Sequence, residues 1–187
     1  MDETLELLKY FPDTVFPKEP LETLRLTVRA LVKREDGKFG FLKIEGEDEL
    51  GYHNYLDLCG GGVEEGESLD QAMIRETGEE LGFAVRQLSC LGPVAYDYHL
   101  IRRRTLEYLY IVEVDTGSQK TDRTEAERLL IKEIEWLSLE EALKRLKQVS
   151  GSIWAGMIQA RHLFFVEYYL KTLTASNSKG EARESLR

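Results

Sequence analysis

The sequence of 187 residues contains few cysteines, few histidines and no long hydrophobic run. Its two cysteines, Cys59 and Cys90, exclude a disulfide framework and the ligand spacing of zinc sites, so we expect free thiols in a reducing compartment. No stretch approaches the roughly 18 consecutive apolar residues of a membrane-spanning helix. The first residues are acidic and lack the basic and apolar regions of a signal peptide. We therefore expect a cytoplasmic protein with no membrane partner.

The sequence also has fewer basic residues than acidic ones. The chain has 25 Lys and Arg against 34 Asp and Glu, and its formal net charge of −9 disfavours duplex nucleic acid as a partner. A small anionic substrate stays compatible, because a bound metal ion inverts the field around it. The length and the hydrophobic content of 42% predict one globular domain with a sizeable core.

Hydrophobic periodicity predicts a mixed α/β chain with antiparallel hairpins and helices on more than one face of a sheet. Apolar residues alternate from Leu24 to Val32, a glycine turn follows at 35–38, and Phe39 to Ile44 continue as a second strand. We expect further strands at 55–58, 85–90, 94–98, 104–114 and 131–137. Residues 46–54 read as a polar loop, and Gly92-Pro93 as a break between two strands.

Helices are expected at 2–10, 68–82, 139–148 and 154–173. Ser68 with Gln71, and Ser138 with Glu141, form capping-box patterns at two of their starts. The resulting division is an N-terminal arm (1–23), a domain (24–148), a C-terminal helix packed on that domain (149–174) and a disordered tail (175–187). The arm and the apolar last helix make a homodimer plausible.

The most informative stretch runs from Gly60 to Phe83, where a glycine-rich turn enters an acidic helix. Glu76, Glu79 and Glu80 fall on one helical face, because residues three and four apart are neighbours there. Like charges so placed repel each other, and the helix dipole disfavours negative charge near a helix C-terminus. We therefore expect a compensating cation, with a divalent metal as the first candidate.

The same stretch resembles the Nudix box: Gly61, five residues, Glu67, seven residues, then Arg75 to Phe83 reading RETGEELGF. The resemblance covers about residues 24–148. It implies a Nudix-type α/β/α sandwich with a mixed β-sheet and a catalytic loop-helix motif. It also implies a hydrolase that cleaves nucleoside diphosphates linked to another group. Thr77 and Cys59 stand where the family usually has an aliphatic residue and a proline.

By this resemblance, Mg²⁺ or Mn²⁺ is bound by Glu76, Glu79, Glu80 and the backbone carbonyl of Gly60. Carboxylate and carbonyl oxygens are the ligands that these hard cations prefer. Arg75 is expected to orient the glutamates through an ion pair, with Glu67 as one possible partner.

The reaction also needs a general base, and a carboxylate with a raised pKa can serve. The candidates are Glu79 or Glu76 in the helix, and Glu125 or Glu127 in the loop at 116–128. The sequence leaves this choice open.

Substrate contacts are expected from arginines, whose guanidinium groups suit phosphates, and from an aromatic side chain that could stack on a base. The candidates are Arg29 on the first strand, Arg102 and Arg104 within the triplet 102–104, and Tyr98. These residues do not identify the substrate, which could be a nucleotide sugar, a dinucleotide or a nucleoside triphosphate.

Two other functions remain compatible with the fold. One is a catalytically silent module that senses a nucleotide, against which the three intact glutamates count. The other is an isomerase of isopentenyl diphosphate, which would need an additional catalytic cysteine. Cys59 lies in the glycine turn, which is not where that cysteine is expected.

Overall fold

The computed structural model describes residues 5–48, 51–118, 120–148 and 153–184. Its strands are β1 (Lys9–Phe11), β2 (Thr23–Lys33), β3 (Phe39–Asp48), β4 (Gly51–Asp57), β5 (Phe83–Tyr98), β6 (Arg103–Ser118) and β7 (Ile131–Leu137). The helices are α1 (Leu69–Glu76), the π-helical turn η1 (Thr77–Leu81), α2 (Glu125–Leu130), α3 (Leu139–Leu146) and α4 (Ile153–Glu184).

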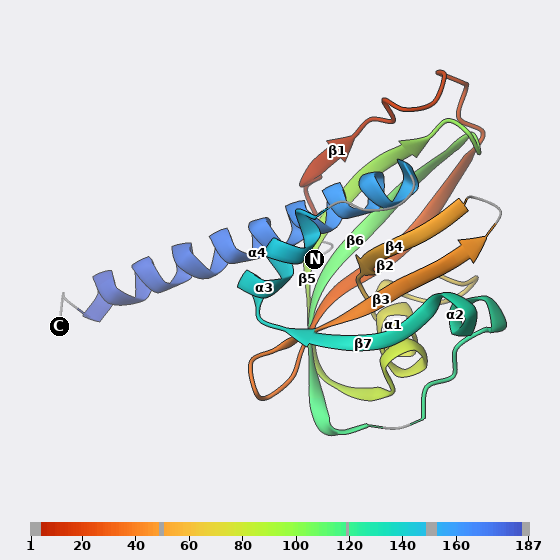
Figure 1. The fold of residues 1–187 in the computed structure, drawn as a ribbon. Helices are drawn as coiled ribbons and strands as arrows, with labels where there is room; N and C mark the ends of the chain where they lie inside the picture. Colours follow the sequence, from red (N-terminus) through yellow and green to blue (C-terminus); the bar gives the residue numbers. More distant parts are fainter. Residues whose placement is uncertain (1–4, 49–50, 119, 149–152, 185–187) are drawn as a thin grey trace.

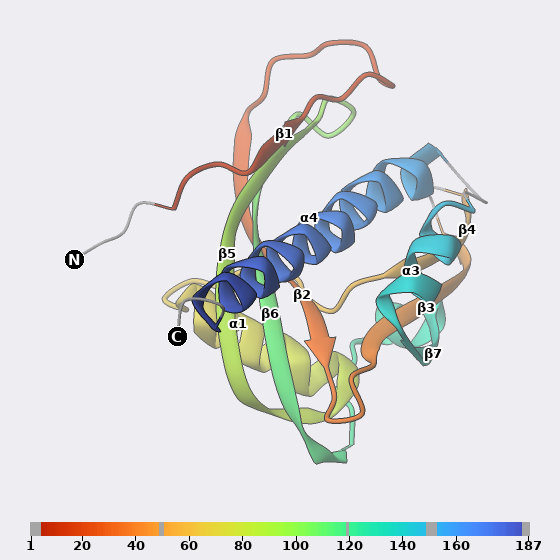
Figure 2. The ribbon, with the colours of Figure 1, turned by 90° about the vertical axis from the view of Figure 1, so that its left-hand side faces the viewer.

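The mixed sheet lies between two helical layers (Figures 1 and 2). On one face, Ala72 and Met73 of α1 share a buried cluster with Val28 and Val112 of the sheet. On the other face, Phe165 of α4 shares a second cluster with residues of the sheet and α3. The expected α/β/α sandwich is therefore confirmed.

The sheet diverges between β2 and β3, and this divergence positions the glycine-rich loop. The strand order is β1-β5-β6-β2-β3-β4, with β7 on β3, and β2 runs parallel to β6 along its whole length. In contrast, β2 and β3 pair only beside their turn, at Val32–Gly40 and Lys33–Phe39. The free edge of β2 bonds residues 59–63 instead, through Val28 N–H to Gly61 O and Ala30 N–H to Cys59 O, both 2.9 Å. The glycine loop thus acts as an irregular extra strand.

Several predicted elements are confirmed. The hairpin of β2 and β3 forms around the turn at 35–38, and β7 and α3 occupy their predicted places. Both capping boxes are present, with Gln71 N–H donating to Ser68 Oγ and Glu141 N–H donating to Ser138 Oγ.

Two predictions about the strands were wrong. Residues 46–54 are not a loop, because β3 and β4 pair as a hairpin from Leu42–Asp57 to Asp48–Gly51. The predicted break at Gly92-Pro93 is a β-bulge inside one long strand, with a positive φ of 132° at Gly92. A bulge bends a strand without ending it.

The two ends of the chain also differ from prediction. In place of a helix at 2–10, residues 9–11 form β1, which satisfies the otherwise open edge of β5 by parallel pairing; residues 1–4 lie outside the described residues. In place of a disordered tail from residue 175, α4 continues to Glu184 and projects beyond the sheet (Figure 1), with 185–187 outside the described residues. No proline interrupts this segment, so the backbone can remain helical.

The N-terminal arm packs on α4. Phe11 lies with its ring centroid 5.6 Å from that of Phe164, and Phe16 lies 5.2 Å from Trp154. The arm and α4 are thus integrated into the domain. Within the described part of the chain, no helix is both long and apolar enough to cross a membrane.

We predict that Gly60→Ala destabilises the fold by about 2 kcal/mol or more. Gly60 has a φ of +136°, and a Cβ there would lie 2.1 Å from the Val28 carbonyl oxygen that borders the loop. The matched control is Gly78→Ala, where a Cβ meets nothing within 4 Å. Helix propensity predicts that this control is stabilised by up to about 1 kcal/mol. Urea unfolding of both variants measures the difference, and equal stabilities would contradict the assigned constraint.

Candidate active site

The acidic helix has two segments, and the change between them falls at the glutamates. α1 ends at Glu76 and continues as the π-helical turn η1, which Gly82 terminates with a left-handed φ of 74°. The Thr77 hydroxyl donates to Met73 O at 2.7 Å beside this change. Sequence periodicity predicted one regular helix. π-helical turns are rare and frequent at functional sites, because they alter which side chains share a face.

Glu76 and Glu80 are buried against the glycine loop. The Gly60 N–H donates to Glu80 Oε2 at 2.7 Å, and Glu80 is 5% exposed. A Cβ at Gly61 would lie 2.3 Å from Glu76 Oε1, so a side chain at this position would displace the carboxylate. The loop glycines therefore let two carboxylates approach the backbone closely.

Burial changes the protonation of these two acids. It raises the pKa of Glu80 to about 8, although the positive charge of Arg29 acts in the opposite direction. Burial also raises the pKa of Glu76, opposed by Arg75. Without a further cation, the buried charges are incompletely compensated.

Arg75 links the three box acids that lie around it. Its Nε and Nη2 donate to both oxygens of Glu67, at 2.9 and 3.0 Å. Its Nη1 donates to Glu76 Oε1 at 2.9 Å and to Glu79 Oε2 at 3.1 Å. The Glu79 side chain is 39% exposed, in contrast to buried Glu76 and Glu80. Arg75 thus supplies part of the positive charge that we expected the helix glutamates to need.

The donor set fits a hard divalent cation. Among the residues the structure describes, no three carboxylate, imidazole or thiol side chains already converge on one point. Mg²⁺ is usually bound by one or two carboxylates, with waters and substrate phosphates as its other ligands, and Glu76 and Glu80 meet that need. The Gly60 carbonyl accepts a short hydrogen bond from Arg29 Nη1, which leaves its second lone pair for a metal.

Arg29 connects the glycine loop to the opposite face of the sheet. Its Nη1 also donates to Leu58 O at 2.8 Å, and its guanidinium lies 3.5 Å from Glu107 and 3.6 Å from Asp57. Glu107 is 2% exposed. Arg29 is therefore held by two acids and two carbonyls at the border of the loop.

A polar cavity of about 150 Å³ lies beyond Arg29, between the sheet and α4. Strands β2, β5 and β6 form one wall, α4 forms the other, and Gly61 lies at its border. The cavity therefore begins at Gly61, the loop glycine that also packs against Glu76. Its cationic lining residues are Arg25, Arg29, Arg103 and Arg161.

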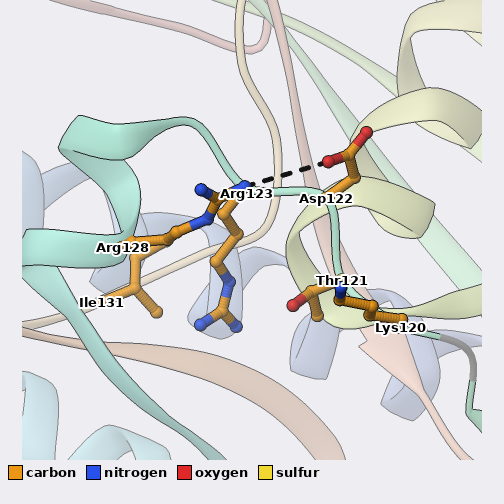
Figure 3. A pocket seen from close by; sticks show the side chains of 6 residues that line it. All are labelled: Lys120, Thr121, Asp122, Arg123, Arg128 and Ile131. Atoms are coloured by element: carbon orange, nitrogen blue, oxygen red, sulfur yellow. Dashed lines mark ion pairs between the residues drawn. The ribbon is translucent and has the colours of Figure 1, made fainter.

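A larger cavity, of about 570 Å³, lies beside the end of η1 (Figure 3). Its wall includes Asp122, Arg123 and Arg128, and Asp122 pairs with Arg128 at 4.0 Å. The Asp122 N–H donates to Glu79 O at 2.9 Å, and the Arg123 guanidinium donates to Glu80 O at 3.0 and 2.6 Å. This loop caps the carbonyls at the C-terminal end of the acidic helix.

Comparison with known proteins agrees with this architecture. A family model described as the NUDIX domain matches residues 23–155. The chain belongs to the Nudix family. Its enzyme class is that of the Nudix pyrophosphohydrolases, which generally use a divalent metal and act on small nucleotide-type substrates.

Several solved structures have the same fold. A NUDIX hydrolase from Nitrosomonas europaea has 20% identity and a TM-score of 0.54, over 77% of this chain and 89% of that one. The MutT protein from Methanosarcina mazei Go1 has 19% identity and a TM-score of 0.55, over 83% and 98%. An ADP compounds hydrolase has 19% identity and a TM-score of 0.57, over 80% and 74%. A search of curated proteins found no match.

The two departures from the Nudix pattern are packing positions. Thr77 and Cys59 are both fully buried, and Cys59 pairs with Ala30 on the edge of β2. Burial raises the pKa of the Cys59 thiol, which keeps it protonated and unreactive.

Among the predicted substrate residues, Arg29 and Tyr98 line the 150 Å³ cavity, whereas Arg102 and Arg104 do not. Arg102 pairs with Glu22 at 2.6 Å, and Arg104 pairs with Asp97 at 2.7 Å. Strand alternation directs the middle arginine of the triplet, Arg103, into the cavity instead. Arg103 and Glu107 lie on the same face of β6, because they are four residues apart on a strand. The sequence does not show that this face is buried, so it gave no reason to prefer Arg103 over its two neighbours.

The alternative bases of this Nudix chain lie in the first turn of α2. Glu127 Oε2 accepts from the Thr124 N–H at 2.7 Å as part of a capping box. Glu125 is exposed in the same turn. Both residues therefore occupy a solvent-facing turn, and Glu127 already has a structural role.

We predict that Mg²⁺ stabilises the protein through Glu76 and Glu80. At a concentration of about 100 times Kd, the thermal midpoint should rise by about 5 °C or more. Glu80→Gln should lose this shift while its metal-free stability is unchanged or higher, because one of two neighbouring buried acids becomes neutral. Glu140→Gln, on the exposed face of α3, serves as the control and should keep the full shift. A full shift in Glu80→Gln would contradict the metal assignment.

Proposed function

We propose that this Nudix enzyme uses Mg²⁺ or Mn²⁺ to hydrolyse a diphosphate bond in a nucleoside diphosphate linked to another group. Nucleotide sugars, dinucleotides and nucleoside triphosphates all have this bond. The observation that supports the proposal most directly is the position of Glu76 and Glu80. Both are buried against a glycine loop that also borders an arginine-lined cavity.

In this proposal, the metal is held by Glu76, Glu80 and the Gly60 carbonyl, with Glu79 available as a further ligand. When bound, it supplies Lewis-acid chemistry, lowering the pKa of water and neutralising charge on the phosphate oxygens. The glycine loop keeps these donors at fixed positions, because its backbone is bonded to the edge of β2.

Glu79 is the group that we propose as the general base. It is the most exposed of the three helix carboxylates, and Arg75 holds it through a single contact to one oxygen. Its other oxygen can accept the proton of a water molecule as that water attacks phosphorus. The bridging P–O bond then breaks, and the leaving phosphate departs with the bond's electrons.

Arg75 and Glu67 are positioning residues in this scheme. The bidentate contact with Glu67 fixes the plane of the guanidinium, so the remaining N–H groups are directed at Glu76 and Glu79. Arg29, at the border of the loop, is placed to contact a substrate phosphate from the cavity side.

We predict that Glu79→Gln lowers kcat by roughly 10²- to 10⁴-fold, the usual contribution of a general base. KM should change little, since the amide keeps the size of the side chain. Glu125→Gln is the matched comparison, because that glutamate is the exposed alternative base in α2. Rates are measured with Mg²⁺ and a panel of nucleoside diphosphate derivatives, with phosphate-containing products identified.

The same assay separates the other assignments. If Glu125→Gln or Glu127→Gln loses turnover and Glu79→Gln retains it, the base lies in α2. Nucleotide binding without cleavage of any compound would support the sensing module. Conversion of isopentenyl diphosphate would support the isomerase.

We also propose that the protein is located in the reducing cytoplasm and that it can form a homodimer. Cys59 and Cys90 are free thiols, as a reducing compartment requires. The exposed apolar side chains of the arm, Leu5, Leu7 and Val15, are where a second copy could pack.

A further inference from the structure

The cavity between the sheet and α4 is strongly cationic in a protein of net charge −9. Arg25, Arg29, Arg103 and Arg161 line it. The acids that face them are Asp57, which pairs with Arg29, and Glu107, which lies 3.5 Å from Arg29 and 4.0 Å from Arg161. The cavity therefore has two more arginines than acids.

Arg25 and Arg103 are the arginines in excess. Among the described residues, neither is paired with a carboxylate. Burial lowers the pKa of Arg103, and the nearby positive charge of Arg25 lowers it further. Arg25 Nη2 packs directly on the glycine loop, where a Cβ at Gly62 would lie 2.8 Å from it. Uncompensated guanidinium groups thus extend from the loop into the cavity.

Three polar groups of the cavity have no hydrogen-bond partner within the described part of the chain. They are Arg103 Nε, Thr105 Oγ1 and Arg161 Nε. The Arg161 side chain is 8% exposed and Thr105 is 1% exposed, so both groups face the cavity and not the outer surface. Buried polar groups are nearly always hydrogen-bonded in folded proteins. The two N–H groups and the hydroxyl require acceptors, which the oxygens of an anion supply.

The aromatic side chains of the cavity are already engaged with neighbouring side chains. The Arg161 guanidinium lies 3.8 Å from the Tyr96 ring centroid. Tyr98 contacts Tyr96 at 5.4 Å and Trp154 at 5.0 Å between ring centroids. Arg161 covers one face of Tyr96, which is 7% exposed, so this ring offers little surface on which a base could stack.

The volume of the cavity also favours a small anion. At about 150 Å³ the cavity holds the volume of about five water molecules, below the range of roughly 300–1,000 Å³ for pockets that enclose drug-sized ligands. α4 closes it on the side away from the sheet, through Ile158, Arg161 and His162. A group that enters must be small and must end there.

We propose that this cavity is a subsite for a terminal phosphate of the substrate, and that Arg161 and Thr105 determine this specificity. The preferred substrate class is then a nucleotide with an uncapped phosphate chain, such as a nucleoside triphosphate, rather than one capped by a sugar or a second nucleoside. This inference rests on the proposed function for its reaction, but binding of the anion does not depend on turnover.

The first test measures binding of inorganic diphosphate by titration calorimetry in EDTA, with no metal or turnover. The wild type should bind, and Thr105→Val and Arg161→Met should each bind roughly 10- to 100-fold more weakly, as expected for losing a hydrogen bond to a charged group. Arg86→Met, on the exposed part of β5 and paired with Glu113, is the control and should bind as the wild type does.

Thr105→Val keeps this test independent of folding. Its hydroxyl has no partner in the fold, so the isosteric valine should leave the thermal midpoint unchanged or raise it. A residue with a structural role alone would show the reverse pattern, with a lowered midpoint and unchanged anion affinity. That pattern, or wild-type affinity in both variants, would overturn the proposal.

The second test compares kcat/KM in Mg²⁺ for ATP and for UDP-glucose as probes of uncapped and capped chains. Thr105→Val should lose roughly 10- to 100-fold on ATP and little on UDP-glucose. Equal losses on the two compounds, or no loss on either, would overturn the subsite while leaving hydrolysis intact. If the wild type cleaves no compound of the panel of nucleoside diphosphate derivatives but binds diphosphate as predicted, the proposed function fails and the anion subsite stands.

Discussion

The contact between the glycine loop and the free edge of β2 is the constraint on which the site depends. β2 and β3 diverge after two paired residues, and the loop fills the vacated edge by donating and accepting backbone hydrogen bonds. This contact leaves no room for a side chain at Gly60, where a Cβ would lie 2.1 Å from Val28 O. An unpaired strand edge can pair with another chain, and here it is instead covered by the glycine loop that it supports.

The loop separates two regions of opposite charge. Glu76 and Glu80 pack against it at Gly61 and Gly60, and Arg25 and Arg29 contact it at Gly62 and Gly60. A metal on the acidic side and phosphate oxygens on the basic side would compensate both. In the proposed mechanism, binding of metal and substrate together would offset the free energy cost of burying these charges.

Sequence alone predicted the acidic half of this arrangement well, because its residues lie within one local segment. Capping residues located the start of the helix, and Glu76 and Glu80 are both buried against the loop, whereas Glu79 is more exposed. The basic half was harder to predict. The sequence could not distinguish Arg103 from Arg102 and Arg104, because packing against α4 determines which face of β6 is buried. Arg161 could not be found because it reaches the site through tertiary packing alone. The π-helical turn η1 and the strand β1 likewise have no local sequence signal that distinguishes them from alternatives.

The central claim is that one glycine loop borders two sites, a metal site at Glu76 and Glu80 and a cavity for a terminal phosphate at Thr105 and Arg161. Anomalous diffraction from crystals soaked with Mn²⁺ and diphosphate tests it most directly. The account predicts a manganese peak within coordination distance of carboxylate oxygens of Glu76 and Glu80, with phosphate density against Thr105 and Arg161 in the cavity. A manganese peak at Glu125 and Glu127, or phosphate confined to the cavity beside Arg123, would contradict it.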